Sequence, residues 1–142
     1  MNNKRIPLNL RPNSLLEVSL RVKEGYEDFG PALREFLDEF YFESKISSRQ
    51  SMILDMPVLI SPIEDAYLAA IAEHLARLYN LNIPNWVNNP DRFLKEPYFP
   101  FGLESLKAYC IVNSPLSFRK RMIFTEENPL KRASQNYKKE SA

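Results

Sequence analysis

Apolar and polar residues recur along most of the chain with the spacing of short amphipathic helices. The clearest case lies in residues 31–43, where apolar residues recur at i, i+3, i+4, i+7 and i+8 between charged ones. These apolar residues are Leu33, Phe36, Leu37, Phe40 and Tyr41. Pro31 suits the first position of this helix, and the pattern ends near Glu43.

A longer helix is predicted over residues 61–79. Ser61 suits the N-cap, Pro62 the first helical position, and Glu64 the acidic end of a capping box. Asn80 suits the end of the helix. One stripe should face the core, and the helix also contains several alanines that allow another helix to approach closely. The stripe comprises Tyr67, Ala70, Ile71, His74, Leu75 and Leu78.

Residues 14–24 allow two interpretations. Ser14 followed by Glu17 matches a capping box and favours a helix. The apolar residues of this segment alternate with a period of two, as in a strand. They are Leu16, Val18, Leu20 and Val22. We prefer the helix, and the strand remains the alternative interpretation.

Three further helices are predicted in the rest of the chain. The first covers residues 47–54 and stops before Pro57, and the last runs from Ser114 through Arg121. The middle one, over residues 103–112, should place four side chains on one side. These are Leu103, Leu106, Tyr109 and Cys110.

Residues 83–102 form a proline-aromatic connector, with four prolines and five aromatic residues. The aromatic residues are Trp86, Phe93, Tyr98, Phe99 and Phe101. They suit a satellite of the core, and they equally suit an exposed patch that docks a partner protein, because aromatic residues are common anchors of interfaces.

Together these patterns predict an all-α fold. The 142 residues include only three glycines and no Asn-Gly or Asp-Gly hairpin turn, whereas 11 prolines separate the periodic segments. We expect a single compact domain of six or seven short helices over residues 14–132. An N-terminal extension (residues 1–13) would precede it, and a polar, disordered tail (residues 133–142) would follow.

The composition argues against several kinds of chemistry. One Cys and one His exclude a disulfide within the chain and clustered Cys or His metal sites. The three glycines lie too far apart for a phosphate-binding loop. We therefore predict no catalytic residues, no metal and no cofactor. The absence of an export signal or a membrane-spanning stretch favours a cytoplasmic protein.

Two single residues are interpreted as structural. His74, on the apolar stripe, should be half-buried with a hydrogen-bond partner, and should bridge its helix to the segment around Trp86. Cys110 should be a buried thiol. Carboxylate pairs such as Glu64 and Asp65 are interpreted as solvated helix faces. An active site around His74 and Glu73 is a minor alternative.

The C-terminal end is basic. Residues 116–142 contain seven Lys or Arg and three Glu, whereas the whole chain has a net charge of only +1. Such a segment can bind phosphates, so nucleic-acid binding through the run from Arg119 to Arg121 and the tail is one hypothesis. The charges can equally lie in solvent around apolar core residues.

Several sequence blocks resemble a family of small bacterial proteins over residues 30–132. The blocks are Ala32–Tyr41, Asp65–Leu68, Ala72–Ala76, Pro84–Val87, Asn89–Leu94, Pro97–Phe99, Asn113–Arg121 and Ile123–Phe124. In that family the domain occurs alone or behind a helix-turn-helix domain, and its neighbours resemble nucleotidyltransferase-type toxins. The resemblance implies an antitoxin role. No helix-turn-helix pattern is visible in this sequence.

The leading hypothesis is therefore a non-enzymatic interaction protein that binds and neutralises a co-encoded toxin. Its contact residues would be aromatic and arginine side chains of the connector and of the basic run. The candidates are Trp86, Arg92, Phe93, Tyr98, Arg119 and Arg121.

Overall fold

Every regular element in the computed structural model, which describes residues 10–133, is helical. The α-helices are α1 (Leu15–Lys23), α2 (Phe29–Phe42), α3 (Ile46–Leu54), α4 (Pro62–Leu78), α5 (Lys107–Asn113) and α6 (Leu116–Arg119). Three 3-10 turns are η1 (Asn85–Asn88), η2 (Pro90–Arg92) and η3 (Glu104–Leu106). The predicted all-α single domain is confirmed. Most of the predicted extension and tail, residues 1–9 and 134–142, lies outside the described residues.

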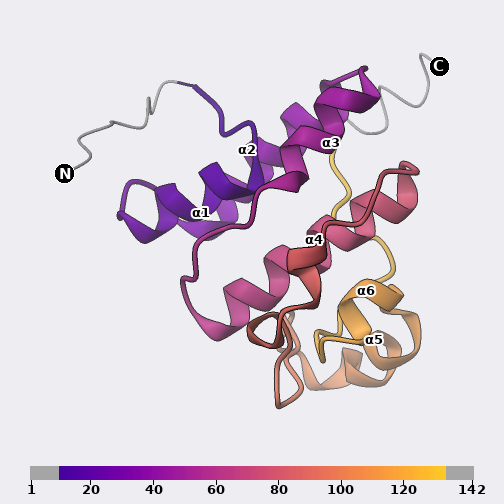
Figure 1. Cartoon of the computed structure of the whole chain (residues 1–142). Coiled ribbons are helices and arrows are strands. Elements are labelled where there is room, and N and C mark those ends of the chain that lie inside the picture. The colour runs from indigo at the N-terminus through magenta and orange to yellow at the C-terminus, as the bar shows by residue number, and fades with distance from the viewer. Residues whose placement is uncertain (1–9, 134–142) are drawn as a thin grey trace.

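Helix α4 is the centre of the fold. It crosses the middle of the molecule, with α1, α2 and α3 on one side and α5 and α6 on the other (Figure 1). The turns η1 and η2 and helix α6 pack against it. Its fully buried residues are Ala66, Leu68, Ala69, Ala70, Ile71, Ala72, Leu75 and Ala76. The buried surface is thus wider than the predicted stripe. Leu78 was expected in that stripe, but it is 54% exposed because it lies in the last turn.

The N-terminal helices form a layer beside α4. Residues 14–24 are helical, as preferred, and the Ser14 Oγ accepts a hydrogen bond of 3.0 Å from the Glu17 N–H. Helix α1 packs on α2. Edge-to-face ring contacts then join α2 to α4, with centroids 5.9 Å apart for Phe29 and Tyr67.

Helix α4 begins as predicted, with Ser61 as the N-cap and Pro62 as the first helical residue, but its capping hydrogen bonds differ, and α2 begins earlier than predicted. Helix α2 begins at Phe29, two residues before Pro31. At the start of α4, the Ser61 hydroxyl donates to Glu64. Instead, the carboxylate of Asp65 binds the backbone that leads into α4, because its Oδ1 accepts a hydrogen bond from the Ile60 N–H at 2.7 Å. Asp65 is therefore buried and is not part of a solvated face.

The connector is partly core and partly surface. Trp86 is 7% exposed and Val87 is fully buried, whereas Phe101 is 49% exposed. Backbone hydrogen bonds tie the connector to the segment after α6. The Tyr98 N–H donates to the Met122 carbonyl at 2.8 Å, the Phe124 N–H donates to the Tyr98 carbonyl at 2.9 Å, and the Leu94 N–H donates to the Arg121 carbonyl at 3.4 Å.

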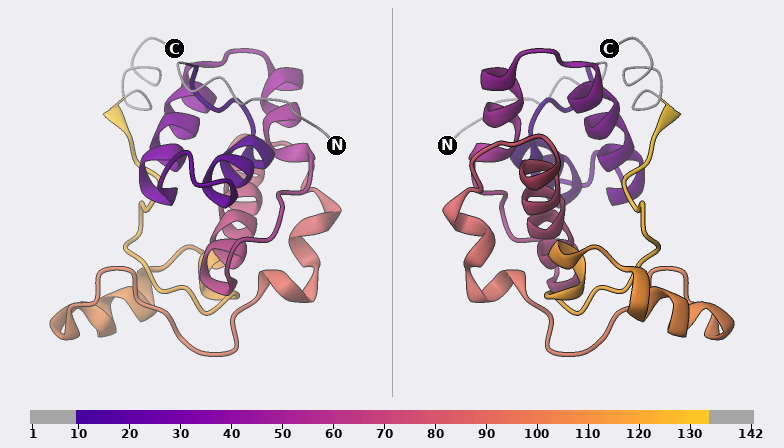
Figure 2. Two further views of the ribbon diagram at one scale, coloured as in Figure 1. Left: turned by 90° about the vertical axis from the view of Figure 1, so that its left-hand side faces the viewer. Right: turned by 90° about the vertical axis from the view of Figure 1, so that its right-hand side faces the viewer.

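Helix α5 projects from the body of the molecule (Figure 2). The expectation that four side chains of residues 103–112 share one inner side is wrong, because only Cys110 is buried. The reason is a change of helix type, from the 3-10 turn η3 to the α-helix at Lys107. Leu103, Leu106 and Tyr109 are exposed.

Asn80 ends α4 as predicted. It adopts the left-handed conformation, with φ 61°, and the following Leu81 N–H donates to the Ala76 carbonyl at 2.8 Å. This is the hydrogen bond of a Schellman motif, in which a residue with positive φ reverses the chain. Leu81 itself is buried, so the motif turns the chain back onto the core.

We expect Asn80→Val to lower the free energy of unfolding by about 1–2 kcal/mol, because a β-branched side chain opposes positive φ. Asn80→Gly should be neutral or slightly stabilising, since glycine adopts this conformation without strain. Asn80 is exposed, so neither change disturbs packing. Urea denaturation of the three proteins measures the difference, and equal stabilities for the Val and Gly variants would contradict the assignment.

Candidate protein-interaction surface

Trp86 and Arg92 are buried together. The Trp86 indole N–H donates to the Ile53 carbonyl at 3.2 Å, and the Arg92 guanidinium lies 4.9 Å from the Trp86 ring centroid. Arg92 is 1% exposed and donates to the carbonyl of Pro57 at 2.6 Å and to that of Asp65 at 3.3 Å. This corrects the expectation that the two residues lie on a contact surface. Their side chains join the connector to α4 and to the segment before it.

Arg121 is also buried, with no exposed surface. Its guanidinium donates to the carbonyls of Ser117 and Val87, each at 2.8 Å, and lies over the Phe93 ring at 4.7 Å. It also donates to Glu73 Oε1 at 2.8 Å. Arg121 was expected to be a contact residue, but a partner cannot reach a side chain enclosed in this way.

The carboxylate of Glu73 is the electrostatic centre of the molecule. It is 1% exposed and binds three cations: Arg121, Lys120 at 2.9 Å and Arg77 at 2.8 Å. Burial by itself would raise the pKa of Glu73. The hydrogen bonds from Lys120, Arg77 and Arg121 outweigh burial and lower the pKa from 4.5 to about 2.

Sequence analysis did not identify Glu73 as a buried anchor. The residue occurs in an alanine-rich helix, where an acidic side chain normally marks the solvent side. Its partner Arg121 is 48 residues away, beyond any helical spacing. The sequence contained one signal for this pair. A single acidic residue lies within an apolar run, and a run of basic residues occurs elsewhere in the chain.

Most of the basic run from Arg119 to Arg121 forms ion pairs within the fold. Lys120 and Arg121 bind Glu73, whereas Arg119 is exposed and donates only to the Val112 carbonyl, at 3.4 Å. The hypothesis of nucleic-acid binding therefore has one free cation of this run in the described residues. Of the other basic residues that it invokes, Lys131 is exposed and Arg132 pairs with Asp38, whereas Lys138 and Lys139 lie outside the described residues.

The remaining predicted contact residues are partly accessible. Phe93 and Tyr98 are half-buried and both line a cavity beside the start of α4. Arg119 lies next to the projecting helix α5. These three residues can still contact a partner, unlike the three that are buried.

His74 and Cys110 have structural surroundings. The half-buried His74 ring packs edge-on against Phe118 of α6, with centroids 5.7 Å apart, and burial lowers its pKa. It thus bridges α4 to α6 and not to the Trp86 segment. The predicted hydrogen-bond partner of its ring is not found among residues 10–133. Cys110 is 2% exposed, which confirms a buried thiol.

The most distinctive surface is apolar and lies on residues 101–116, which we name the α5 arm. Its seven large apolar side chains are 38–71% exposed. They are Phe101, Leu103, Leu106, Tyr109, Ile111, Val112 and Leu116. They are seven of the seventeen exposed large apolar residues in the described part of the chain. Such a concentration is typical of an interaction surface.

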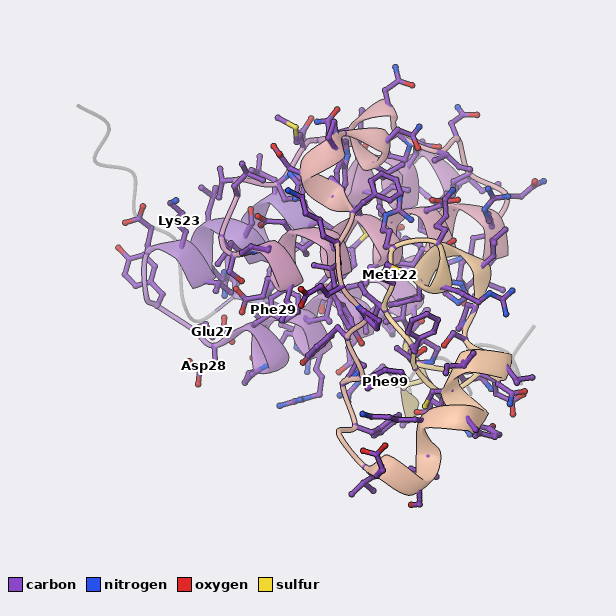
Figure 3. All side chains as sticks on the ribbon, turned by 90° about the horizontal axis from the view of Figure 1, so that it is seen from below. Lys23, Glu27, Asp28, Phe29, Phe99 and Met122 are labelled. Carbon is purple, nitrogen blue, oxygen red and sulfur yellow. The ribbon has the colours of Figure 1, made fainter. Side chains whose placement is uncertain are left out.

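The most exposed side chain of α5 faces away from the buried Cys110. At about 100° per residue, Val112 lies about 160° from Cys110, whereas Tyr109 and Ile111 lie about 100° to either side of it, and the Tyr109 hydroxyl donates to Glu127 at 3.0 Å. The base of the arm is held by Phe99, whose ring stacks on Phe124 at 5.3 Å and lies 5.1 Å from the Lys107 ammonium. Figure 3 shows Phe99 beside the helix of the arm. The arm is therefore anchored at its base and accessible along its outer side.

Neither a metal-binding cluster nor a membrane-spanning helix is found in the part of the chain that the structure describes. Over residues 10–133, no group of three or more His, Cys, Asp or Glu residues could hold a metal ion. None of the helices in this range combines the length and apolar character needed to cross a bilayer.

Comparisons of the chain with models of protein families, with curated proteins and with solved structures give no match. The resemblance to the antitoxin-associated family stays a prediction.

Replacing Glu73 tests its role as an anchor. Glu73→Gln should lower the free energy of unfolding by about 3–5 kcal/mol, because it leaves the buried Arg121 guanidinium without a counter-ion. Arg77→Gln is the matched control. It removes a cation that is 49% exposed and should have an effect of about 0–1 kcal/mol. Urea denaturation measures both, and similar losses would contradict a special role of the buried pair.

The low pKa of Glu73 also predicts a dependence on pH. A carboxyl whose pKa is about 2 in the folded state and 4.5 in the unfolded chain contributes stability that is fully present above about pH 4.5. This contribution is lost as the pH falls toward 2. The difference in unfolding free energy between wild type and Glu73→Gln should therefore shrink over this interval. A difference that is the same at neutral pH and at pH about 2 would contradict the assignment.

Proposed function

We propose that the protein is a non-enzymatic interaction module that binds and neutralises a co-encoded nucleotidyltransferase-type toxin. The exposed apolar surface of the α5 arm is the observation that carries the proposal. The class of partner rests on the family resemblance of residues 30–132. Antitoxin action of this kind requires a stable protein contact and no chemistry of its own.

The size of the arm suits such a contact. A large apolar side chain has a surface of about 150–250 Å², so seven that are about half exposed offer roughly 700 Å². A stable interface buries about 800 Å² on each partner. The arm and a few neighbouring residues together reach this value.

The shape and chemistry of the arm suit insertion into a concave partner. The arm projects from the body (Figure 2), so a cleft can surround it without meeting α1, α2 or α3. Its exposed side chains are mostly apolar, together with the ion pair of Glu104 and Lys107, and Arg119 lies at its edge. We propose that the arm occludes the active site or substrate groove of the toxin.

Photo-crosslinking from the arm tests the proposal. A photoreactive amino acid in place of Val112, which is 71% exposed, should crosslink the product of the adjacent gene in the native host. The same residue in place of Ile46, which is 69% exposed at the start of α3, is the matched control and should not. Mass spectrometry identifies the crosslinked protein.

A functional readout compares substitutions on the arm with one at the control position. The double change Ile111→Ser and Val112→Ser should weaken binding of that gene product by about 10- to 100-fold and abolish rescue of growth, whereas Ile46→Ser should not. Circular dichroism checks that each variant is folded. Equal crosslinking at both positions, or full rescue by the arm variant, would overturn the proposal.

A further inference from the structure

Two neighbouring cavities lie at the N-terminal end of α4. Their volumes are about 580 and 420 Å³, and Ile63 and Tyr98 line both of them. We name the pair the α4 groove. Each volume lies in the range of ligand-binding clefts. None of the seven exposed apolar residues of the α5 arm lines the groove, so the two surfaces are separate.

The larger half of the groove combines apolar walls with acidic groups. Its walls include Phe93 and several proline and leucine side chains. Asp65, Asp91 and Glu96 line it together with a single cation, Lys95. Within residues 10–133, none of these carboxylates forms an ion pair.

The surroundings of Asp65 indicate which kind of group this acidic half binds. The side chain is 6% exposed, its Oδ1 accepts from the Ile60 N–H, and its Oδ2 has no hydrogen-bond partner among the described residues. The buried guanidinium of Arg92 lies behind the wall, where it donates to backbone carbonyls. The lining has three carboxylates and one ammonium, and the Arg92 guanidinium behind it interacts electrostatically with Asp65 and Asp91. The carboxylates still outnumber these two cations, so this half favours a cation.

The smaller half of the groove has the opposite charge. Arg34, Lys131 and Arg132 line it, together with one acid, Glu64. Arg132 forms a bidentate pair with Asp38, with both distances 3.0 Å. Arg34 and Lys131 are exposed and form no ion pair within residues 10–133. Two free cations therefore face this half, which favours a carboxylate.

We infer that the α4 groove binds an extended peptide segment of another protein, with basic residues at one end, apolar residues in the middle and acidic residues at the other. The basic end lies against Asp65, Asp91 and Glu96, and the acidic end lies against Arg34 and Lys131. The apolar middle covers Ile63 and Tyr98. Charges of opposite sign at the two ends of one apolar groove are complementary to such a segment and to its direction.

The groove recognises the bound peptide through the side chains of the peptide, not through its backbone. Both backbone groups of Tyr98 are already bonded, its N–H to Met122 and its carbonyl to Phe124. The connector therefore offers no free strand edge at this point for a peptide to pair with. Specificity comes from the charge order and from the apolar contacts.

Fluorescence anisotropy with three labelled, end-capped heptapeptides tests the inference on the full chain. The first has two lysines, Leu-Phe-Leu and two glutamates. The second has the same composition with one lysine and one glutamate at each end, and the third has lysines at both ends. We expect the first to bind about tenfold more tightly than the second, with a preference that decreases as salt is added.

Charge substitutions then locate the binding site. Arg34→Glu should remove the preference for the first peptide over the second, because the smaller half is then lined by two cations, Lys131 and Arg132, and two carboxylates. Ile63→Glu, at a residue that is 39% exposed, should abolish binding of all three. Leu78→Glu, at the opposite end of α4 and 54% exposed, is the matched control and should change nothing.

Equal binding of the first two peptides, or an unchanged ranking in Arg34→Glu, would overturn the inference. Absence of binding by every peptide would do the same, as would binding that survives Ile63→Glu. The inference does not rest on the proposed function. The Ile111→Ser and Val112→Ser arm variant should bind the peptides like wild type, so failure of one proposal is distinguishable from failure of the other.

Discussion

The buried carboxylate of Glu73 is the interaction on which the rest of the structure depends. Enclosing a charge in a protein interior is unfavourable unless opposite charges and hydrogen bonds compensate for the lost water. Here three cations do so, and two of them, Lys120 and Arg121, come from the end of α6. The pairing therefore determines where the C-terminal part of the chain lies on α4. Removing either side leaves a charge in the interior.

Buried arginines extend this arrangement to the irregular segments. The connector and the segment before α4 have few backbone hydrogen bonds of their own, and their carbonyls still need donors. Arg92 supplies donors to Pro57 and Asp65, and Arg121 supplies one to Val87. The planar guanidinium can serve several carbonyls at once and also stack on an aromatic ring. Arginine side chains thus supply to these backbone carbonyls the hydrogen bonds that regular secondary structure supplies elsewhere in the fold.

The same arrangement explains why the surfaces proposed for binding lie where they do. The core around α4 is formed by alanine and leucine side chains together with the buried arginines, and the large apolar residues of the α5 arm lie outside it. The arm is held at its base and exposed along its outer side. The α4 groove has a different character, because its apolar middle has charges of opposite sign at its two ends.

The sequence by itself determined the local structure. Helix periods predicted α2 and most of α4, and Ser14 and Asn80 act as the cap and the terminator that their positions indicated. These features depend on residues within about four positions of each other, which a linear pattern shows directly. Only the tertiary structure decided that Trp86, Arg92 and Arg121 are internal and that Leu106 and Tyr109 are exposed. Arg121 meets Glu73 across 48 residues, and whether an arginine is an anchor or a contact depends on such distant partners.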